Sequence, residues 1–331
     1  CMPSRALTFL KEIREAIRAA DRVVVVIGPR CVASDYCRAE WQAALAESKP
    51  VTPVLRLGQR SMLPAELRGF HSPDLSARAD PATGLRDLLR VLREPPPLGP
   101  LIGGVPDVPP HFQPRPDALS ALASQLLVDE RKPVTLTGPE RVTVLHGMGG
   151  LGKSVITAAF ARSTTTRRSF ADGVLWLPCG EPTPPLALMA ELARLLGDPP
   201  QHHATLGESA TRLASLLQPR SLLIVLDNTW LPDQAEPLVD VLGSACRLLL
   251  TTRRADLAQT LGAPAIALEL PDEAVALKHL ADWAGVAPDT LPPEAAEVAG
   301  ECGRLPFALA LNGAMHQQGI AWADLAAALR A

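Results

Sequence analysis

The segment from Gly147 to Ser154 has the residue types and the spacing of a phosphate-binding loop. Its sequence is G-M-G-G-L-G-K-S, in which glycines let the backbone curl around an anion with successive N–H groups pointing inward. In such a loop Lys153 neutralises the β- and γ-phosphates, and the hydroxyl of Ser154 ligates Mg²⁺. The glycines of the predicted phosphate cradle are Gly147, Gly149, Gly150 and Gly152. The loop predicts a nucleotide-binding protein.

A carboxylate that can complete this site follows four apolar residues, Leu223 to Leu226, which predict a buried strand. Asp227 at the end of such a strand can hold Mg²⁺ through water opposite Ser154. The next residue is Asn228, whose neutral amide can position a water molecule but cannot accept its proton at neutral pH. We therefore expect slow nucleotide hydrolysis, with Asp227 and Asn228 in the catalytic positions.

The elements predicted around these residues follow the order that a phosphate-binding loop requires. Residues 141–145 read as a buried strand and residues 155–161 as a helix, so the loop joins a strand to a helix. Further strands are predicted at 174–177, 222–226 and 247–252, and helices at 186–196 and 208–217. We expect a nucleotide-binding α/β domain over residues 113–270 and a small helical subdomain over residues 271–331.

The first 94 residues have an alternating pattern of their own. The predicted elements are a helix at 7–20, a strand at 23–27, a helix at 34–47, a strand at 51–57 and a helix at 84–93. Such alternation implies a parallel sheet with helices on its faces. Residues 95–112 are rich in proline and glycine and predict a linker between the two α/β domains.

Composition limits the classes to which the chain can belong. The net charge is −3, and no basic block indicates a nucleic-acid partner. No apolar run approaches the ~18 residues that cross a bilayer, and no signal peptide opens the chain, so we expect a cytoplasmic protein without membrane contact. The chain opens at Cys1 and stops in a helical pattern at Ala331, so we expect a fragment truncated at both ends.

Four motifs in order resemble the NB-ARC module of STAND signalling ATPases, found in plant immune receptors, apoptosome proteins and bacterial relatives. The loop resembles G-x-G-G-x-G-K-[ST], and residues 223–230 resemble L-L-V-L-D-D-V-W. Residues 250–253 resemble the family's sensor strand, and residues 302–309 resemble C-G-G-L-P-L-A-L. The resemblance implies that Arg253 senses the terminal phosphate and that Pro306 packs near the bound adenine nucleotide, with ADP in the resting state and ATP in the active one.

Three residues depart from the family's motifs. Asn228 stands where the family has a second acid, Arg304 where it has glycine, and Phe307 where it has leucine. We expect the turn before Pro306 to tolerate the last two changes. The family's winged-helix subdomain, and the sensor that would receive an unknown trigger, are expected beyond Ala331.

Residues 5–94 resemble the later part of a TIR domain, especially of the bacterial kind. The resemblance is carried by residues 23–29, 34–41 and 49–55. A serine N-cap at Ser34 would put Cys37 and Glu40 on one helical face. Glu40 occupies the glutamate position of the family's W-C-x-x-E motif, and in enzymatic TIR domains that glutamate assists cleavage of the nicotinamide–ribose bond of NAD.

These resemblances predict a TIR and NB-ARC signalling ATPase, a P-loop NTPase of bacterial immunity or programmed cell death. Activation would bring about self-association and contact with other TIR domains, with possible NAD cleavage by Glu40. Two alternatives stay open. The TIR part can be a non-enzymatic adaptor, or the chain can be an NB-ARC transcription regulator.

Overall fold

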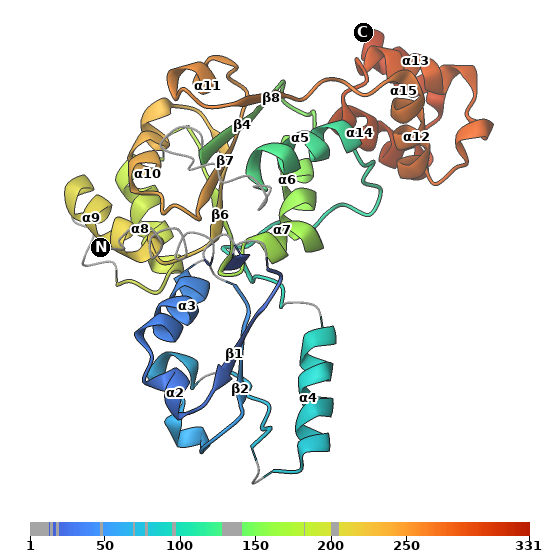
Figure 1. The fold of residues 1–331 in the computed structure, drawn as a ribbon. Coiled ribbons are helices and arrows are strands. Elements are labelled where there is room, and N and C mark those ends of the chain that lie inside the picture. Colours follow the sequence, from blue (N-terminus) through green and yellow to red (C-terminus); the bar gives the residue numbers. More distant parts are fainter. Residues whose placement is uncertain are drawn as a thin grey trace.

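The computed structural model places three parts in chain order (Figure 1): a small α/β unit, a central α/β unit and a helical unit that ends at the C-terminus. It describes residues 13, 16–17, 20–46, 49–68, 70–76, 79–94, 97–127, 141–181, 183–199 and 205–331. The helix predicted at 7–20 lies mostly outside the described residues. Within the described residues, none of the helices combines the length and the apolar character that crossing a membrane demands.

The first unit contains a two-stranded parallel sheet, β1 (Val23–Ile27) paired with β2 (Val51–Leu55). Helices α2 (Pro29–Val32) and α3 (Asp35–Ala46) connect the two strands, and the 3₁₀ turns η1 (Arg60–Met62) and η2 (Ala65–Leu67) follow. Its core contains Ile27, Trp41, Leu63 and Leu67, each almost fully buried. This unit thus builds a hydrophobic core of its own.

Helix α4 (Pro81–Arg93) begins earlier than the predicted start at residue 84. The Asp80 carboxylate accepts hydrogen bonds from the backbone N–H groups of Ala82 and Thr83, which is an N-cap. Pro81 fits the first helical position, where its missing N–H costs nothing. An acidic cap followed by proline therefore extends the helix by one turn.

The segment predicted as a linker at 95–112 differs from that expectation, because part of it is built into the central sheet. Strand β3 (Leu101–Ile102) pairs in parallel with residues 174–175. Arg167 donates from Nε to the carbonyl of Gly99 at 2.8 Å, and Arg162 donates to the carbonyls of Val105 and Pro106. Pro100 lacks an N–H donor directly before the strand, and Gly103 adopts a φ of +80° directly after it, so the strand has two residues and is hidden in the sequence.

The central sheet has six parallel strands in the order β3-β5-β6-β7-β4-β8. The strands after β3 are β4 (Val142–His146), β5 (Gly173–Pro178), β6 (Leu222–Thr229), β7 (Arg247–Thr252) and β8 (Ala265–Ala267). The helices of this unit are α5 (Pro116–Leu126), α6 (Lys153–Arg162), α7 (Thr164–Ser169), α8 (Pro185–Leu195), α9 (Leu206–Leu217), α10 (Glu236–Val241) and α11 (Asp256–Thr260). The predicted α/β class is confirmed.

Alternate residues of the buried strands face opposite sides of this sheet, which produces three layers. On one side Ile224 and Leu248 join the core formed with α8, α9 and α10. On the other side Val225 and Leu249 pack with α5 and α6, and Leu122 belongs to the same cluster. Because the strands are covered on both faces, their sequences are continuous apolar runs rather than alternating ones.

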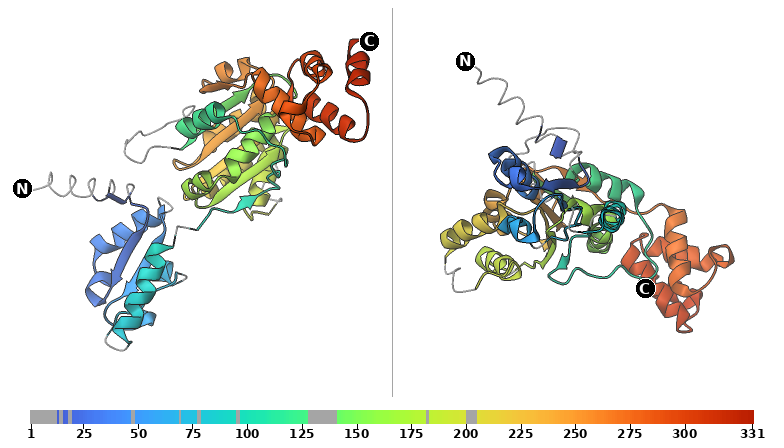
Figure 2. Two further views of the ribbon diagram at one scale, coloured as in Figure 1. Left: turned by 90° about the vertical axis from the view of Figure 1, so that its right-hand side faces the viewer. Right: turned by 60° about the horizontal axis from the view of Figure 1, so that its bottom comes forward.

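The last unit is a cluster of helices, α12 (Glu273–Ala284), α13 (Pro293–Glu301), α14 (Pro306–Gln317) and α15 (Trp322–Arg330). Asp272 caps α12 through a hydrogen bond from the N–H of Val275. Leu280, Val298, Leu309 and Trp322 form its buried core. Figure 2 shows this unit beside the end of the central sheet, opposite the side on which the first unit lies.

Candidate nucleotide-binding site

The phosphate loop joins β4 to α6, as its sequence predicts. Gly150 and Gly152 have φ values of +81° and +88°, in the left-handed region that side-chain-bearing residues rarely adopt. Gly152 is the N-cap of α6, so the positive end of this helix opens on the loop. The backbone therefore has the shape that an anion-binding loop needs.

Lys153 opens α6 and turns back over the loop. Its Nζ donates hydrogen bonds to the carbonyls of Gly147 at 2.7 Å and Met148 at 2.8 Å. Burial, followed by the positive charge of Arg253, lowers the pKa of Lys153 below its ordinary value. A phosphate bound in place of the two carbonyls would raise the pKa of Lys153, because it would supply negative charge next to the ammonium group.

The carboxylate of Asp227 faces the loop from β6. Ser154 donates from Oγ to Oδ1 of Asp227 at 2.7 Å, and Thr251 donates from Oγ1 to the same oxygen at 2.6 Å. Strand β7 lies between β4 and β6 in the sheet, and it supplies Thr251 as a bridge. The sequence predicts the pairing of Ser154 with Asp227 but gives no sign of the threonine.

Asn228 has a positive φ of 67°, which asparagine tolerates better than most residues. The strand pairing shifts register between Leu226 and Thr229, so Asn228 sits in an irregularity of β6. Its backbone N–H donates to Oγ1 of Thr251 at 2.8 Å. Asn228 also lines a cavity beside the P-loop.

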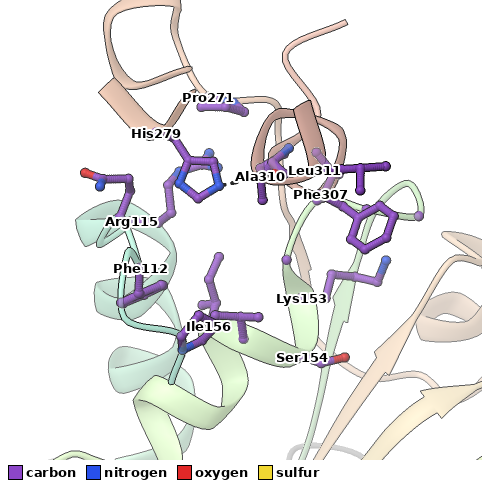
Figure 3. Close-up of a pocket in the computed structure, with 18 of the residues that line it drawn as sticks. Phe112, Arg115, Lys153, Ser154, Ile156, Pro271, His279, Phe307, Ala310 and Leu311 are labelled. Carbon is purple, nitrogen blue, oxygen red and sulfur yellow. Dashed lines mark hydrogen bonds between the residues drawn. The ribbon is translucent and has the colours of Figure 1, made fainter. Parts of the chain in front are cut away.

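A cavity of about 680 Å³ lies between the central and helical units (Figure 3). The residues predicted for the site that line it are Gly149, Gly150, Gly152, Lys153, Ser154, Asn228, Arg253 and Pro306. Gly147 and Asp227 are connected to it through hydrogen bonds with Lys153 and Ser154. One end of the cavity thus gathers the phosphate-binding and metal-binding groups.

The other end of the cavity is largely apolar. Phe112, Ile156 and Pro271 contribute to it, and α14 contributes Phe307 beside Lys153. His279 of α12 also lines the cavity, and its Nε2 lies 3.2 Å from the carbonyl oxygen of Pro306. Burial lowers the pKa of His279, so the neutral imidazole is favoured. A flat heterocycle fits such a wall, with its phosphates reaching the loop.

Residues 109–115 form a part of the site that sequence reasoning missed. Phe112, Gln113 and Arg115 line the cavity. Gln113 accepts a hydrogen bond from Lys278 Nζ at 2.8 Å, and Arg115 donates to the carbonyl of Glu269 at 3.0 Å. The segment therefore ties the start of the central unit to the helical unit. The sequence feature that could have indicated this role is the apolar Phe112 among prolines.

Glu40 lies in the first unit, outside this cavity, on helix α3. The N–H of Cys37 donates to Oγ of Ser34 at 3.3 Å, so the expected serine cap is present. Burial raises the pKa of the Cys31 thiol to about 11, and the nearby Cys37 and Glu40 add to the rise. Glu40 and Cys37 are half-buried, whereas Arg38 between them is exposed.

Two models of known families match this chain, one over each α/β unit. The model of the NB-ARC domain matches residues 124–276, and the model of the TIR domain matches residues 4–89. The chain combines a TIR domain with an NB-ARC domain. The P-loop, Asp227 and Arg253 all lie inside the NB-ARC match, and Glu40 lies inside the TIR match. NB-ARC domains are P-loop ATPase domains that bind ATP and ADP.

Two curated proteins are similar to this TIR and NB-ARC chain. Apoptotic protease-activating factor 1 of Homo sapiens is 27% identical over 227 residues, which cover 64% of the chain and 17% of the human protein. Regulatory protein AfsR of Streptomyces griseus is 27% identical over 312 residues, which cover 92% of the chain and 29% of that protein. The chain thus spans less than a third of each relative.

Among solved structures, a STAND protein with a tetratricopeptide repeat sensor from Pyrococcus horikoshii matches with a TM-score of 0.43. It is 15% identical, and the match covers 63% of this chain and 30% of that one. NtrX from Brucella abortus in complex with ATP matches with a TM-score of 0.35 at 15% identity, over 97% of this chain and 78% of that one. Likenesses this distant carry no argument about the site.

Proposed function

We propose that the NB-ARC domain is a switch driven by ATP and ADP, and that the TIR domain is its effector in bacterial immunity or programmed cell death. The observation that carries the proposal is the cavity between the central and helical units, with the P-loop at one end and an apolar wall at the other. Because both units line it, the phosphate state of a bound nucleotide can alter how they pack. ADP would stabilise the resting arrangement, and ATP an arrangement that self-associates.

Each predicted site residue has a role in this proposal. Lys153 binds the β- and γ-phosphates, Arg253 senses the γ-phosphate, and Pro306 packs against the base. Ser154 and Asp227 would hold Mg²⁺, which neutralises charge on the phosphates. A hydroxyl and a carboxylate oxygen 2.7 Å apart are the hard oxygen ligands that this ion prefers, so the donor set fits it. Asn228 would position the attacking water.

The first experiment is to denature the purified chain and identify any released nucleotide by chromatography. We expect ADP from the unaltered protein and none from Lys153→Ala, because the lysine supplies charge to the phosphates. Circular dichroism of both proteins checks that the variant is folded. Absence of adenine nucleotide from the unaltered protein, together with no binding of added ADP, would refute the switch.

We also propose that the TIR domain cleaves NAD, with Glu40 as the carboxylate that stabilises positive charge on the ribose. The half-buried position of Glu40 on α3 beside Cys37 supports this assignment. NAD loss should be followed by chromatography with and without an ATP analogue, and Glu40→Gln should abolish it. NAD loss that persists in Glu40→Gln contradicts the catalytic assignment, and no loss in any assembled state leaves the adaptor role.

A regulatory role in transcription is the second candidate, and one observation favours it. The similarity to regulatory protein AfsR extends over 92% of this chain. Footprinting on genomic DNA from the source organism tests this candidate. Protection of specific sites that depends on nucleotide would establish it over the TIR-effector proposal.

A further inference from the structure

The guanidinium group of Arg253 lies near both an aromatic ring and the backbone of the P-loop. Its Cζ is 5.7 Å from the centroid of the Trp230 ring, within the range of a cation–π contact. A Cβ added to Gly149 would lie 3.2 Å from the same Cζ and 3.4 Å from Nε. The guanidinium group thus lies close to both the indole and the P-loop glycine.

The indole is the contact that fixes this side chain. Arg253 is exposed and makes no hydrogen bond or ion pair with any residue that the structure describes. Its neighbour Arg254 differs, since it forms an ion pair with Asp256 at the same strand end. Lys153 lies close enough for the two positive charges to repel, which favours movement of Arg253 into solvent.

Trp230 is itself firmly placed through its backbone. Its N–H donates to Oε1 of Gln234 at 2.9 Å, and its carbonyl accepts from Arg254 at 3.3 Å. Gln234 is buried and donates from Nε2 to the carbonyl of Gly180 at 2.8 Å. Replacement of the indole leaves these bonds intact, so the ring can be tested without loss of the local backbone.

We propose that Trp230 is a positioning residue that holds Arg253 over the P-loop and thereby increases the preference of the site for ATP over ADP. The inference deepens the proposed function and rests on the role of Arg253 at the γ-phosphate. Trp230 does not line the cavity, so it acts through Arg253 rather than on the nucleotide. A cation already in place loses less side-chain entropy when the γ-phosphate arrives.

The test uses four variants: Trp230→Leu, Trp230→Phe, Arg253→Ala and the double variant Trp230→Leu with Arg253→Ala. Leucine keeps apolar bulk without a π face, whereas phenylalanine keeps a ring. The dissociation constants of ADP and of the β,γ-imido analogue of ATP are measured by calorimetry on the whole chain. Melting temperatures show whether each variant is folded.

We expect Trp230→Leu to weaken the ATP analogue about two- to fivefold and to leave ADP unchanged, the size of an exposed cation–π contact. Trp230→Phe should recover part of the loss. In the Arg253→Ala background, Trp230→Leu should have no further effect, because the group that it positions is gone.

The other outcomes separate this inference from the function on which it rests. If Arg253→Ala leaves the ratio of ATP to ADP affinity unchanged, both the γ-phosphate role and the positioning role are overturned. If Arg253→Ala lowers the ratio and Trp230→Leu does not, the positioning role alone is overturned. Equal weakening of both nucleotides by Trp230→Leu and Trp230→Phe would make the tryptophan a structural residue and would also overturn it.

Discussion

The hydroxyl of Ser154 and the carboxylate of Asp227, 73 residues apart in the chain, are joined by a hydrogen bond of 2.7 Å. Thr251 donates to the same carboxylate oxygen at 2.6 Å, so two hydroxyls orient Asp227 toward the P-loop. An oriented carboxylate beside a hydroxyl is a preformed ligand pair for a small hard cation.

Asp227→Asn should lower the affinity for Mg²⁺ by about 10- to 100-fold, because a neutral amide replaces the carboxylate that holds the ion through water. The hydrogen bonds from Ser154 and Thr251 can still be accepted by the amide oxygen, so the fold should persist. Mg²⁺ dependence of nucleotide binding, measured by titration with and without EDTA, checks this. An unchanged Mg²⁺ requirement in a folded variant contradicts the ligand role of Asp227.

Asn228→Asp should raise the rate of ATP hydrolysis, by roughly tenfold or more, because a carboxylate can accept the proton of the attacking water. Aspartate also tolerates the positive φ of 67° at this position, so the backbone need not change. Release of phosphate under single-turnover conditions isolates the chemical step. Asn228→Ser is the control that removes the amide without adding a base, and a rate for Asn228→Asp at or below that of the unaltered protein overturns the assignment.

The sequence predicts the centre of the central domain well because its strands are continuous apolar runs with a glycine loop between strand and helix. Strand β7 occupies the predicted residues 247–252, and β6 continues past the predicted residue 226 to include Asp227. Lys153, Ser154 and Asp227 were found because each belongs to a local pattern. Their mutual geometry follows from the parallel sheet.

Residues that reach the site through tertiary packing could not be found in this way. His279 lies in an ordinary helical pattern of α12, and its place in the cavity depends on how the helical unit packs on the central one. Strand β3 has two residues, too few for any periodicity to show. The contact between Trp230 and Arg253 likewise depends on the ends of β6 and β7 being neighbours in the sheet.

Stability should fall on acidification because burial lowers the pKa of His279 below its ordinary value of 6.5. The unfolded chain then binds a proton that the folded chain resists. The contribution of the neutral His279 to the free energy of unfolding is therefore full above about pH 6.5, and it is lost as the pH falls toward the lowered pKa. Denaturant unfolding of the unaltered protein and of His279→Gln, compared at pH 7.5 and 5.5, measures it. The variant should lose less stability than the unaltered protein, and equal losses refute the assignment.

The segment before α5 should loosen in Arg162→Ala. This arginine donates to the carbonyls of Val105 and Pro106 and forms an ion pair with Asp107 at 2.5 Å. Its removal should cost about 1–2 kcal/mol and speed hydrogen exchange in residues 99–108. Arg168→Ala, at an exposed position on the neighbouring helix α7, is the matched control and should alter neither. Exchange in residues 99–108 that is equal in the two variants contradicts the role of Arg162.

Arg304→Gly should stabilise the helical unit by about 0.5–1 kcal/mol, because Arg304 adopts a φ of +57°, where a Cβ is strained. Glycine relieves that strain at an entropic cost that offsets part of the gain. The N–H of Arg304 donates to the carbonyl of Ala299 at 3.1 Å, and glycine keeps this bond. Arg304→Ala retains the Cβ and removes the charge, so it should give no gain in denaturant unfolding. Equal stabilisation by alanine and glycine would mean that charge, rather than backbone strain, limits stability at this turn.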